Sequence, residues 1–425
     1  MEVVEQLSSG QIRLKPASHP VCRGCGRGDL HQILDLSSVP LANALLTAEG
    51  LTKPEERYPL VFYFCPACAL AQIGETVPPQ KLFSDYVYAS SFSEKMLSHA
   101  RMLVETTIAT RRLAGHHLVI EIASNDGYLL QFYRDRGIPV LGVEPAANIA
   151  AIAESERGIP TLVDFFDRNL AERLASEGRS ADIIHAHNVF AHVPEPGQFL
   201  AALKKALKPD GVIIIEVPYL GDLIDNLEFD TIYHEHFSYF SLTAVERLAR
   251  IAGMSVSDVE RVPIHGGSLR MFLTHDGAAP IAASVGALLG QEAARGMCDS
   301  QYYATFASRV WSLKAELVDL LRQLKSSGKR LAAYGASAKG STLMNAFGIG
   351  ADLLDFVVDR STLKQGRFTP GNRLSILPPE ALIERAAEYV LLLTWNFADE
   401  ILAQQQAFRN AGGRFIVPLP SVKVV

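Results

Sequence analysis

Four of the five cysteines form two Cys-x-x-Cys pairs, Cys22 with Cys25 and Cys65 with Cys68, and 39 residues separate the pairs. A Cys-x-x-Cys turn points two thiolates at one metal ion, and two such turns complete a tetrahedral site. The long gap fits a zinc ribbon with an inserted hairpin. Since cysteine takes every ligand position, we expect a structural zinc ion that stabilises the fold and does no chemistry. The alternatives are two unrelated reduced pairs or a redox-active pair.

A histidine-rich segment at residues 232–241 combines titratable and aromatic groups. Its notable members are Tyr233, His234, Glu235, His236 and Tyr239. A histidine beside a carboxylate can be tuned to remove a proton near neutral pH. We therefore expect acid/base chemistry in this segment. The alternatives are a metal site shared with His187 or His192, and a polar loop without chemistry.

Acidic and small residues follow the apolar runs in the middle of the chain. One run leads through Glu121 into the turn ASNDG (123–127), and the next ends in Glu144, 23 residues after Glu121. Carboxylates in the first turn repel a pyrophosphate but suit a ligand with an amino group. The second acid has the spacing of a ribose-binding residue. The pattern favours S-adenosylmethionine over a nicotinamide dinucleotide, unless Ser124 and Asp126 only cap a helix.

The last third of the chain contains a candidate anion site. The segment RLAAYGASAKGSTLMN (330–345) predicts a strand, a glycine-rich loop and a helix. Backbone N–H groups at a helix N-terminus, together with a lysine, bind anions. A bisphosphate would suit Lys339, Lys364 and Arg367. The loop does not match the P-loop pattern, and an ordinary capped loop is the alternative.

The elements that must position these groups alternate between short apolar runs and helical patterns, which predicts parallel, doubly wound sheets. Functional groups in such sheets lie at the carboxyl ends of the strands. Apolar residues at helical spacing between Tyr302 and Leu324 predict a connecting helix. The sequence divides into a zinc-binding domain (1–75), a doubly wound domain with a helical lead-in (76–280, lead-in 76–115), a helical connector (281–326) and a C-terminal α/β domain (327–425).

Composition narrows the functional classes. Of the 425 residues, 48% are hydrophobic and 20% charged, which is typical of a globular protein rather than a disordered one. The net charge of −6 argues against general nucleic-acid binding. The sequence has no run of 18 apolar residues and no signal-peptide pattern at its start. Few cysteines favour a reducing compartment, so we expect a cytoplasmic protein without membrane contact.

The whole chain resembles the sugar C-methyltransferases of antibiotic deoxysugar pathways. The stretches that carry the resemblance are CRGC and CPAC around the cysteine pairs, PLANALL (40–46), YVYASS (86–91), EIASNDGYLL (121–130), GVEPA (142–146), NVFAHV (188–193), YHEHFSYFS (233–241), HGGSLR (265–270) and YGASAKGSTLMN (334–345). They follow the family's order over nearly the full length. One departure is Ala123, where methyltransferases often have a glycine.

The resemblance implies an α/β protein with three domains: a zinc-ribbon-like N-terminal domain, a central class I (Rossmann-like) methyltransferase domain and a smaller Rossmann-like C-terminal domain. The implied cofactors are S-adenosylmethionine and a structural zinc ion. The implied residues around S-adenosylmethionine are Glu121, Ser124, Asn125, Gly127, Glu144, Asp164, Phe165 and Asn188. The metal ligands are the four paired cysteines.

The implied reaction is C-methylation of a nucleotide-linked 4-keto-deoxysugar, a dTDP sugar methylated at C3, between the middle and C-terminal domains. His236 looks like the base that removes the C3 proton and leaves an enolate, which the ketone makes accessible by delocalising charge onto oxygen. The other implied catalytic residues are Glu235, Tyr233, His192 and one of Tyr86 and Tyr88. The expected substrate-binding residues are His265, Arg270, Tyr334, Lys339, Ser341, Asp359, Lys364 and Arg367.

Three other functional classes compete with this interpretation. The first is a methyltransferase with an oxygen or nitrogen acceptor on a small molecule. The second is a binding or scaffold protein with a degenerate methyltransferase core, which the intact strand-end acids disfavour. The third is a nicotinamide-dependent sugar enzyme, which the lack of a GxGxxG pattern disfavours. A monomer is compatible with three domains that cover their own sheet edges.

Overall fold

The protein is described by a computed structural model that covers residues 4–6, 12–14, 20–83, 91, 94–264 and 266–425. Its N-terminal sheet has the strand order β11-β5-β4-β3, in which β11 (Ser238–Tyr239) comes from the middle of the chain. Strands β3 (His31–Val39), β4 (Tyr58–Phe64) and β5 (Ala71–Ile73) come from the N-terminal domain. Alternate residues of β4 are buried, as expected for a strand with one face on a core. The first two strands, β1 (Val4–Gln6) and β2 (Ile12–Leu14), form a separate hairpin.

The middle domain is built on a seven-stranded sheet of order β12-β13-β10-β9-β6-β7-β8. The parallel strands are β6 (Val119–Ile122), β7 (Val140–Val143), β8 (Thr161–Leu162), β9 (Ala181–His187) and β10 (Leu207–Pro218). Two antiparallel strands, β13 (Ser268–His275) and β12 (Met254–Val262), extend the β10 edge. The predicted doubly wound sheet is confirmed, with an antiparallel edge in addition.

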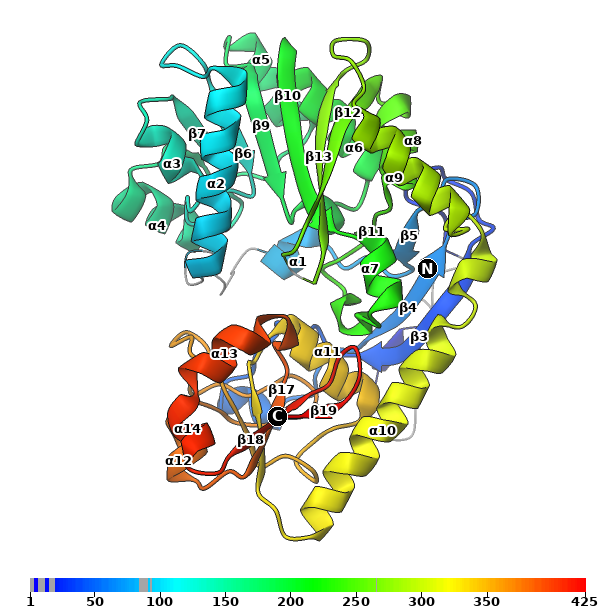
Figure 1. Ribbon diagram of the computed structural model, residues 1–425, viewed down its shortest axis with the longest axis vertical. Coiled ribbons are helices and arrows are strands. Elements are labelled where there is room, and N and C mark those ends of the chain that lie inside the picture. Colours follow the sequence, from blue (N-terminus) through cyan, green and yellow to red (C-terminus); the bar gives the residue numbers. More distant parts are fainter. Residues whose placement is uncertain (1–3, 7–11, 15–19, 84–90, 92–93, 265) are drawn as a thin grey trace.

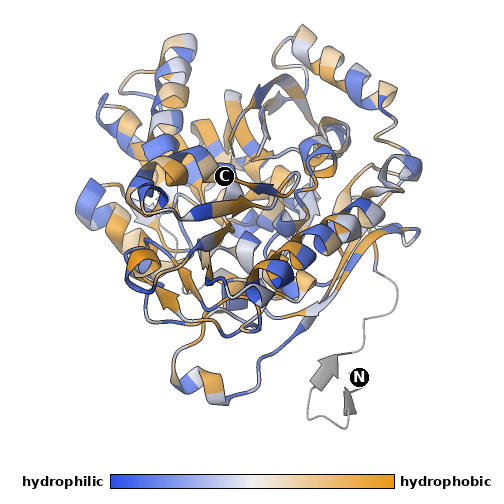
Figure 2. Ribbon diagram, turned by 60° about the horizontal axis from the view of Figure 1, so that its bottom comes forward, coloured by the Kyte–Doolittle hydropathy of each residue, from blue (hydrophilic) through white to orange (hydrophobic). Residues whose placement is uncertain are grey.

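Helices cover both faces of this sheet because alternate residues of its strands are apolar on both sides. Val119 and Ile183 face a core with α2 (Glu94–Arg111), α3 (Leu130–Arg134) and α4 (Ala147–Arg157), whereas Ile120 and Ile184 face the other side. The helices on that other side are α5 (Arg168–Ser176), α6 (Pro196–Ala206), α8 (Leu242–Ile251) and α9 (Ala283–Ala294). Figure 2 shows that the helices of the molecule carry both hydrophilic and hydrophobic residues, whereas its strands are largely hydrophobic.

The C-terminal domain has a six-stranded sheet of order β16-β15-β14-β17-β18-β19. Its strands are β14 (Leu331–Tyr334), β15 (Phe356–Val358), β16 (Ile376–Leu377), β17 (Tyr389–Leu392), β18 (Arg414–Val417) and β19 (Lys423–Val424). Its helices are α11 (Ala338–Phe347), α12 (Ala381–Glu384), α13 (Ala398–Gln404) and α14 (Gln406–Asn410). The predicted connecting helix is present as α10 (Phe306–Ser326), which runs along the outside of the molecule.

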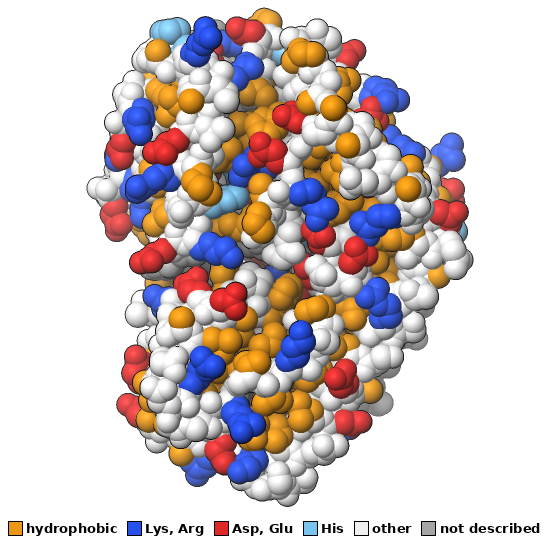
Figure 3. All heavy atoms as spheres, in the orientation of Figure 1, with side chains coloured by type: hydrophobic (Ala, Val, Ile, Leu, Met, Phe, Trp, Pro, Cys, Tyr) orange, Lys and Arg blue, Asp and Glu red, His pale blue; other side chains and the backbone are white. Residues whose placement is uncertain are grey.

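The N-terminal sheet bridges the other two domains. Its strand β3 contacts both α10 and α11, and one continuous core joins Phe62 of β4, Phe229 of the middle domain and Leu343 of α11. A furrow separates the two large halves on the face shown in Figure 3. Within the described part of the chain, no helix is long and apolar enough to cross a membrane.

Candidate active site and metal centre

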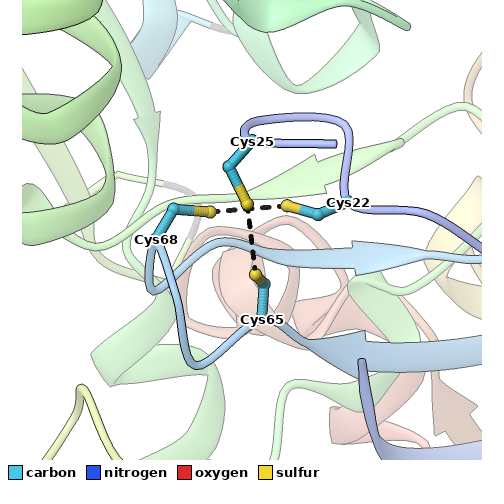
Figure 4. Close-up of side chains that lie close together, drawn as sticks. All are labelled: Cys22, Cys25, Cys65 and Cys68. Atoms are coloured by element: carbon cyan, nitrogen blue, oxygen red, sulfur yellow. Dashed lines mark hydrogen bonds between the residues drawn. The ribbon is translucent and has the colours of Figure 1, made fainter. Parts of the chain in front are cut away.

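The four paired cysteines meet at one point. Their sulfur atoms all lie within 4.8 Å of one another, with 3.4 Å between Cys22 and Cys68 and 3.6 Å between Cys25 and Cys65 (Figure 4). Tetrahedral zinc with Zn–S distances of about 2.3 Å places its sulfurs about 3.8 Å apart. The donor set and spacing therefore fit a structural zinc ion. Within the described residues, no other group of three or more potential ligands is close enough to share one ion.

Each cysteine pair lies on a tight turn that the backbone closes. The N–H of Gly26 donates to the carbonyl of Cys22, and the N–H of Ala69 donates to the carbonyl of Cys65, both at 2.8 Å. Both donor residues have a left-handed backbone, with φ of 74° and 60°. Glycine adopts this conformation without strain, whereas alanine pays for it in conformational energy. The chain accepts that cost at Ala69 because the turn must close around the thiolates.

A cleft of about 1530 Å³ opens between the domains and is lined by all three. Pockets for one small molecule are typically about 300–1,000 Å³, so this cleft has room for two ligands. Lining residues from the N-terminal domain include Arg23, Asn43 and Thr76, those from the middle domain include Asn125, Glu144, Asp164, Phe165, Asn188, His192, Tyr233, Glu235 and His236, and those from the C-terminal domain include Lys339, Asp359 and Lys364.

The carboxyl ends of β6 and β7 form one end of the cleft. Glu144 is buried, and its carboxylate accepts the backbone N–H groups of Asn125 and Ala146 at 3.0 and 2.9 Å. Burial raises the pKa of Glu144 above its usual value, against the effect of these hydrogen bonds. A side chain at Gly142 would lie 2.5 Å from the Ser124 hydroxyl, so the glycine lets the β6 loop approach β7 closely.

Three predicted cofactor residues, Glu121, Ser124 and Gly127, lie behind the cleft wall rather than among the lining residues. Glu121 is fully buried, and burial together with the charges of Asp126 and Glu144 raises its pKa well above the usual range. Glu121 Oε2, Ser124 Oγ and Asp126 Oδ1 are buried without a hydrogen-bond partner among the described residues. Buried polar atoms normally find partners, so these atoms fit a loop that binds a polar ligand.

His236 lines the cleft, and its hydrogen bonds define the tautomer of its neutral ring. Its Nδ1 donates to the carbonyl oxygen of Thr231 at 2.9 Å, which leaves Nε2 as the basic nitrogen. The Tyr233 hydroxyl lies 2.9 Å from Nε2 and donates to it. The ring of His192 meets the ring of His236 edge-on at 4.7 Å. Burial lowers the pKa of His192 to about 4, so this second imidazole is neutral at neutral pH.

The two residues before His236 form hydrogen bonds with the N-terminal domain, and Glu235 also lines the cleft. His234 Nε2 lies 3.1 Å from the carbonyl oxygen of Pro59, and burial lowers the pKa of His234 to about 4. Glu235 Oε1 accepts a hydrogen bond from Asn43 Nδ2 at 2.7 Å. Burial raises the pKa of Glu235 to about 7, although the Asn43 amide favours the charged form. Glu235 is thus a carboxyl group able to exchange a proton near neutral pH.

Arg270 was expected to bind substrate, but the structure places it inside the middle sheet. Strand β13 sets Arg270 opposite Glu216 on one side and Glu260 on the other. Its guanidinium donates to Glu216 at 3.0 Å and to Glu260 at 2.8 Å, and it also contacts His99 of α2. Burial by itself raises the pKa of Glu216, but the hydrogen bond with His99 and the charges of His187, His99 and Arg270 lower it to about 2. Arg270 is not among the residues that line the cleft.

Replacing Arg270 by methionine should lower the free energy of unfolding by about 3–5 kcal/mol, because it leaves Glu216 as a buried, undercompensated charge. The native pKa of Glu216 lies below its ordinary value of 4.5, so its contribution is complete above pH 4.5 and is lost as the pH falls toward 2. Urea unfolding at pH 7 and pH 3.5 measures both effects. The matched control is Arg261→Met, at a 44% exposed arginine on β12, where a loss below about 1 kcal/mol is expected. Equal losses in the two variants would contradict the prediction.

The C-terminal wall carries two of the three predicted basic residues. Lys364 Nζ lies 2.9 Å from the Ala336 carbonyl oxygen and 3.6 Å from Asp359, and the carboxylate of Asp359 accepts the N–H groups of Ala336 and Ser361. Lys339 Nζ lies 4.9 Å from the ring centre of Trp395. Three further predicted residues are absent from the cleft lining: Tyr334, Ser341 and Arg367. Tyr86, Tyr88 and His265 lie outside the described residues.

Sequence reasoning missed many residues of this cleft, and Asn43 and Arg23 are the two that connect the N-terminal domain to the His236 segment. Asn43 lies in the motif PLANALL, which supports the family resemblance, but its type and spacing gave no sign of a partner 192 positions away. Arg23, inside the first cysteine pair, also lines the cleft. The only sequence signal for both residues was their position within a motif, PLANALL for Asn43 and CRGC for Arg23. No local pattern identifies a contact between domains.

Three family models match the chain in order. A zinc binding domain covers residues 22–83, a methyltransferase domain covers residues 71–259, and a C-methyltransferase C-terminal domain covers residues 263–420. The C-methyltransferase NovU of Streptomyces niveus is 37% identical over 410 residues, which cover 95% of this chain and 96% of NovU.

Two further matches cover smaller parts of the chain. A ubiquinone biosynthesis O-methyltransferase of Azorhizobium caulinodans is 27% identical over 97 residues, 23% of this chain and 38% of the relative. The solved magnesium protoporphyrin IX methyltransferase of Synechocystis is 14% identical, with a TM-score of 0.34, and the match covers 42% of this chain and 83% of that one. The three domains in order and the near full-length match show that the chain belongs to the family of S-adenosylmethionine-dependent C-methyltransferases with an N-terminal zinc-binding domain.

Proposed function

We propose that this C-methyltransferase acts on a nucleotide-linked 4-keto-deoxysugar, with a dTDP carrier, and methylates C3. The observation that carries the proposal is the fixed tautomer of His236, which makes Nε2 the basic nitrogen of the ring. His236 lines an interdomain cleft that is large enough for two ligands. S-adenosylmethionine supplies the electrophilic methyl group. The role of the protein is to generate a carbon nucleophile beside it.

In the proposed reaction, His236 Nε2 takes the proton from C3 of the sugar. The electron pair of the broken C–H bond moves into the C3–C4 bond, and the C4 carbonyl oxygen gains negative charge. The enolate then forms the new C3–CH₃ bond while S-adenosylhomocysteine leaves, which restores the ketone. Only a position beside a carbonyl is acidic enough for an imidazole base, and hydrogen bonds to the enolate oxygen lower the barrier further.

Three neighbours of His236 have proposed supporting roles. The Tyr233 hydroxyl donates to Nε2 in the described structure, so it must turn away or pass on a proton when the sugar binds. Glu235 has a pKa of about 7 because it is buried. It can therefore exchange a proton with its surroundings or donate a hydrogen bond to the sugar in the same pH range. Neutral His192 adds a further donor or acceptor beside His236.

The C-terminal wall supports the choice of a nucleotide-linked acceptor. Lys339 and Lys364 line the cleft on the side away from Glu144 and belong to a separate α/β domain. Two lysines near the Ser337-capped start of helix α11 suit a diphosphate. The S-adenosylmethionine site and the diphosphate site would then lie at opposite ends, with His236 between them.

The test of the proposed function is incubation of the protein with S-adenosylmethionine and a dTDP-4-keto-2,6-dideoxysugar, followed by mass analysis of the sugar. The expected product is heavier by one methylene. In deuterated water without S-adenosylmethionine, one deuterium should enter beside the ketone. Methylation on oxygen or nitrogen without deuterium uptake would move the acceptor to another class. Cofactor binding without any sugar product would reject this substrate.

Replacing Glu144 by glutamine is expected to weaken S-adenosylmethionine binding by about 10- to 100-fold. The proposed role of the carboxylate is to accept the ribose hydroxyls, and one hydrogen bond to a charged group is worth about 1.5–3 kcal/mol. Calorimetric titration measures the affinity. The control is Glu156→Gln, at an exposed side chain on α4, which should bind like the wild type. An unchanged affinity in Glu144→Gln would assign the ribose contact to another residue.

A further inference from the structure

The segment that carries His236 is part of the N-terminal sheet. Strand β11 (Ser238–Tyr239) pairs with β5, with Ser238 opposite Gln72 and Tyr239 opposite Ala71. The N–H of Ile73 also donates to the carbonyl of Phe237 at 3.1 Å. The residues that directly follow His236 are therefore held by backbone hydrogen bonds from the zinc-binding domain. The middle domain holds the same residues from their other side, since the N–H of Phe237 donates to the carbonyl of Ala191 at 2.7 Å.

The loop between the first two cysteines reaches the same segment. The guanidinium of Arg23 lies 5.0 Å from the ring centre of Phe237, and it donates to the carbonyl of Glu75 and the hydroxyl of Thr76, both at 2.8 Å. The N–H of Arg23 donates to Gln72, whose own side chain is buried. The metal-binding turn, strand β5 and the residue after His236 thus form one connected unit.

The side chains of the segment divide between this unit and the cleft. His234 is anchored on Pro59 of β4, whereas Glu235 and His236 line the cleft. Asn43 holds one oxygen of Glu235, Oε1, at 2.7 Å. The other oxygen, Oε2, is then the one left for a ligand in the cleft. Without Asn43, a fully buried carboxyl group would lose the side-chain partner that orients it, which is costly in a low-dielectric site.

We infer that the zinc-binding domain is a working part of the active site, in which Asn43 is the positioning residue that orients the Glu235 carboxyl group toward the bound acceptor. This inference rests on the proposed function for the identity of the acceptor. The inference goes beyond the proposed function because it gives the N-terminal domain a role in turnover. The contact between Asn43 and Glu235 spans 192 positions of the chain, so only the docked N-terminal domain can supply it.

The test compares Asn43→Asp with wild type. The variant keeps the shape of the side chain but replaces the N–H donor by a second carboxylate facing Glu235. Turnover should fall by about 10- to 100-fold, the range for a misplaced active-site group, while the affinity for S-adenosylmethionine stays unchanged. Hydrogen exchange of the peptide spanning residues 233–241 should increase, and exchange in β6 and β9 should stay as in the wild type. Asn43→Ser, which retains a donor, is the milder variant if Asn43→Asp fails to fold.

Two controls separate positioning from stability. Gln32→Glu makes the same amide-to-acid change on an exposed residue of the same domain and should leave every readout unchanged. In the double variant Asn43→Asp with Glu235→Gln, the new amide at position 235 can donate a hydrogen bond to the new carboxylate at position 43, the reverse of the wild-type direction. The double variant should regain thermal stability but not turnover, because the carboxyl group is no longer at position 235.

Three results would overturn the inference: wild-type turnover in Asn43→Asp, turnover restored in the double variant, or unchanged hydrogen exchange of the segment 233–241. If the wild-type protein does not methylate the dTDP-4-keto sugar, the proposed function fails. The hydrogen-exchange comparison then decides alone whether Asn43 holds the segment. The two failures are therefore distinguishable.

Discussion

Replacing His236 by asparagine should lower the rate of methyl transfer by about 10²- to 10⁴-fold, the usual contribution of a general base. The asparagine amide can still donate to the Thr231 carbonyl, as Nδ1 does in the wild type. It has no nitrogen that accepts a proton at neutral pH. The substitution therefore removes the base while the local hydrogen bond remains available, and the loss should appear in turnover rather than in folding.

Rapid-quench measurement of product by mass, at saturating S-adenosylmethionine, determines this rate. Deuterium uptake beside the ketone should be lost together with methylation, since both begin with the same proton removal. The matched control is His31→Asn on the exposed edge strand β3, which should keep wild-type turnover. If His236→Asn retained deuterium uptake at the wild-type rate, Tyr233 or Glu235 would become the base.

Local spacing was sufficient to predict the parts of the molecule that lie close together in sequence. The two cysteine pairs each occupy one turn, so their residue types alone predicted the four-sulfur cluster that the structure shows. The carboxyl ends of parallel strands meet at one edge of a sheet. For that reason the alternation of strands and helices was enough to assign Glu144 and Asn188, which directly follow β7 and β9, to one edge of the sheet, and both residues line the cleft.

Strand register and domain docking were not readable from the sequence. Arg270 ends the HGGSLR stretch, which carries part of the family resemblance, and it was expected to bind substrate. The antiparallel register of β13 instead sets it between Glu216 and Glu260. The contact of Asn43 with Glu235 requires the docking of two domains. The positions of Arg270 and Asn43 depend on partners far away in the sequence. The residues next to Arg270 and Asn43 show no pattern that identifies these partners.

Removing zinc is expected to have the second large effect. Cys68→Ser should reduce the metal content from about one zinc per chain toward zero, because a neutral hydroxyl is a poor substitute for a thiolate ligand. Structural zinc contributes about 10–16 kcal/mol in isolated zinc-finger peptides. The loss here should be several kcal/mol but smaller than that, since Leu60, Phe62 and Phe64 remain in a hydrophobic core.

The effect should extend from the metal to catalysis. The turn that ends at Cys68 leads into β5, and β5 pairs with the strand that follows His236. Zinc analysis, thermal unfolding and calorimetric titration with S-adenosylmethionine separate the consequences. The zinc content and the thermal stability should fall, and methyl transfer should be lost. The affinity for S-adenosylmethionine should stay within about threefold of the wild-type value, because the middle sheet itself holds the ends of β6 and β7. Cys298→Ser, at the cysteine outside the cluster, is the control and should keep its zinc. A Cys68→Ser protein that melts and methylates like the wild type would show that the two turns hold together without the metal.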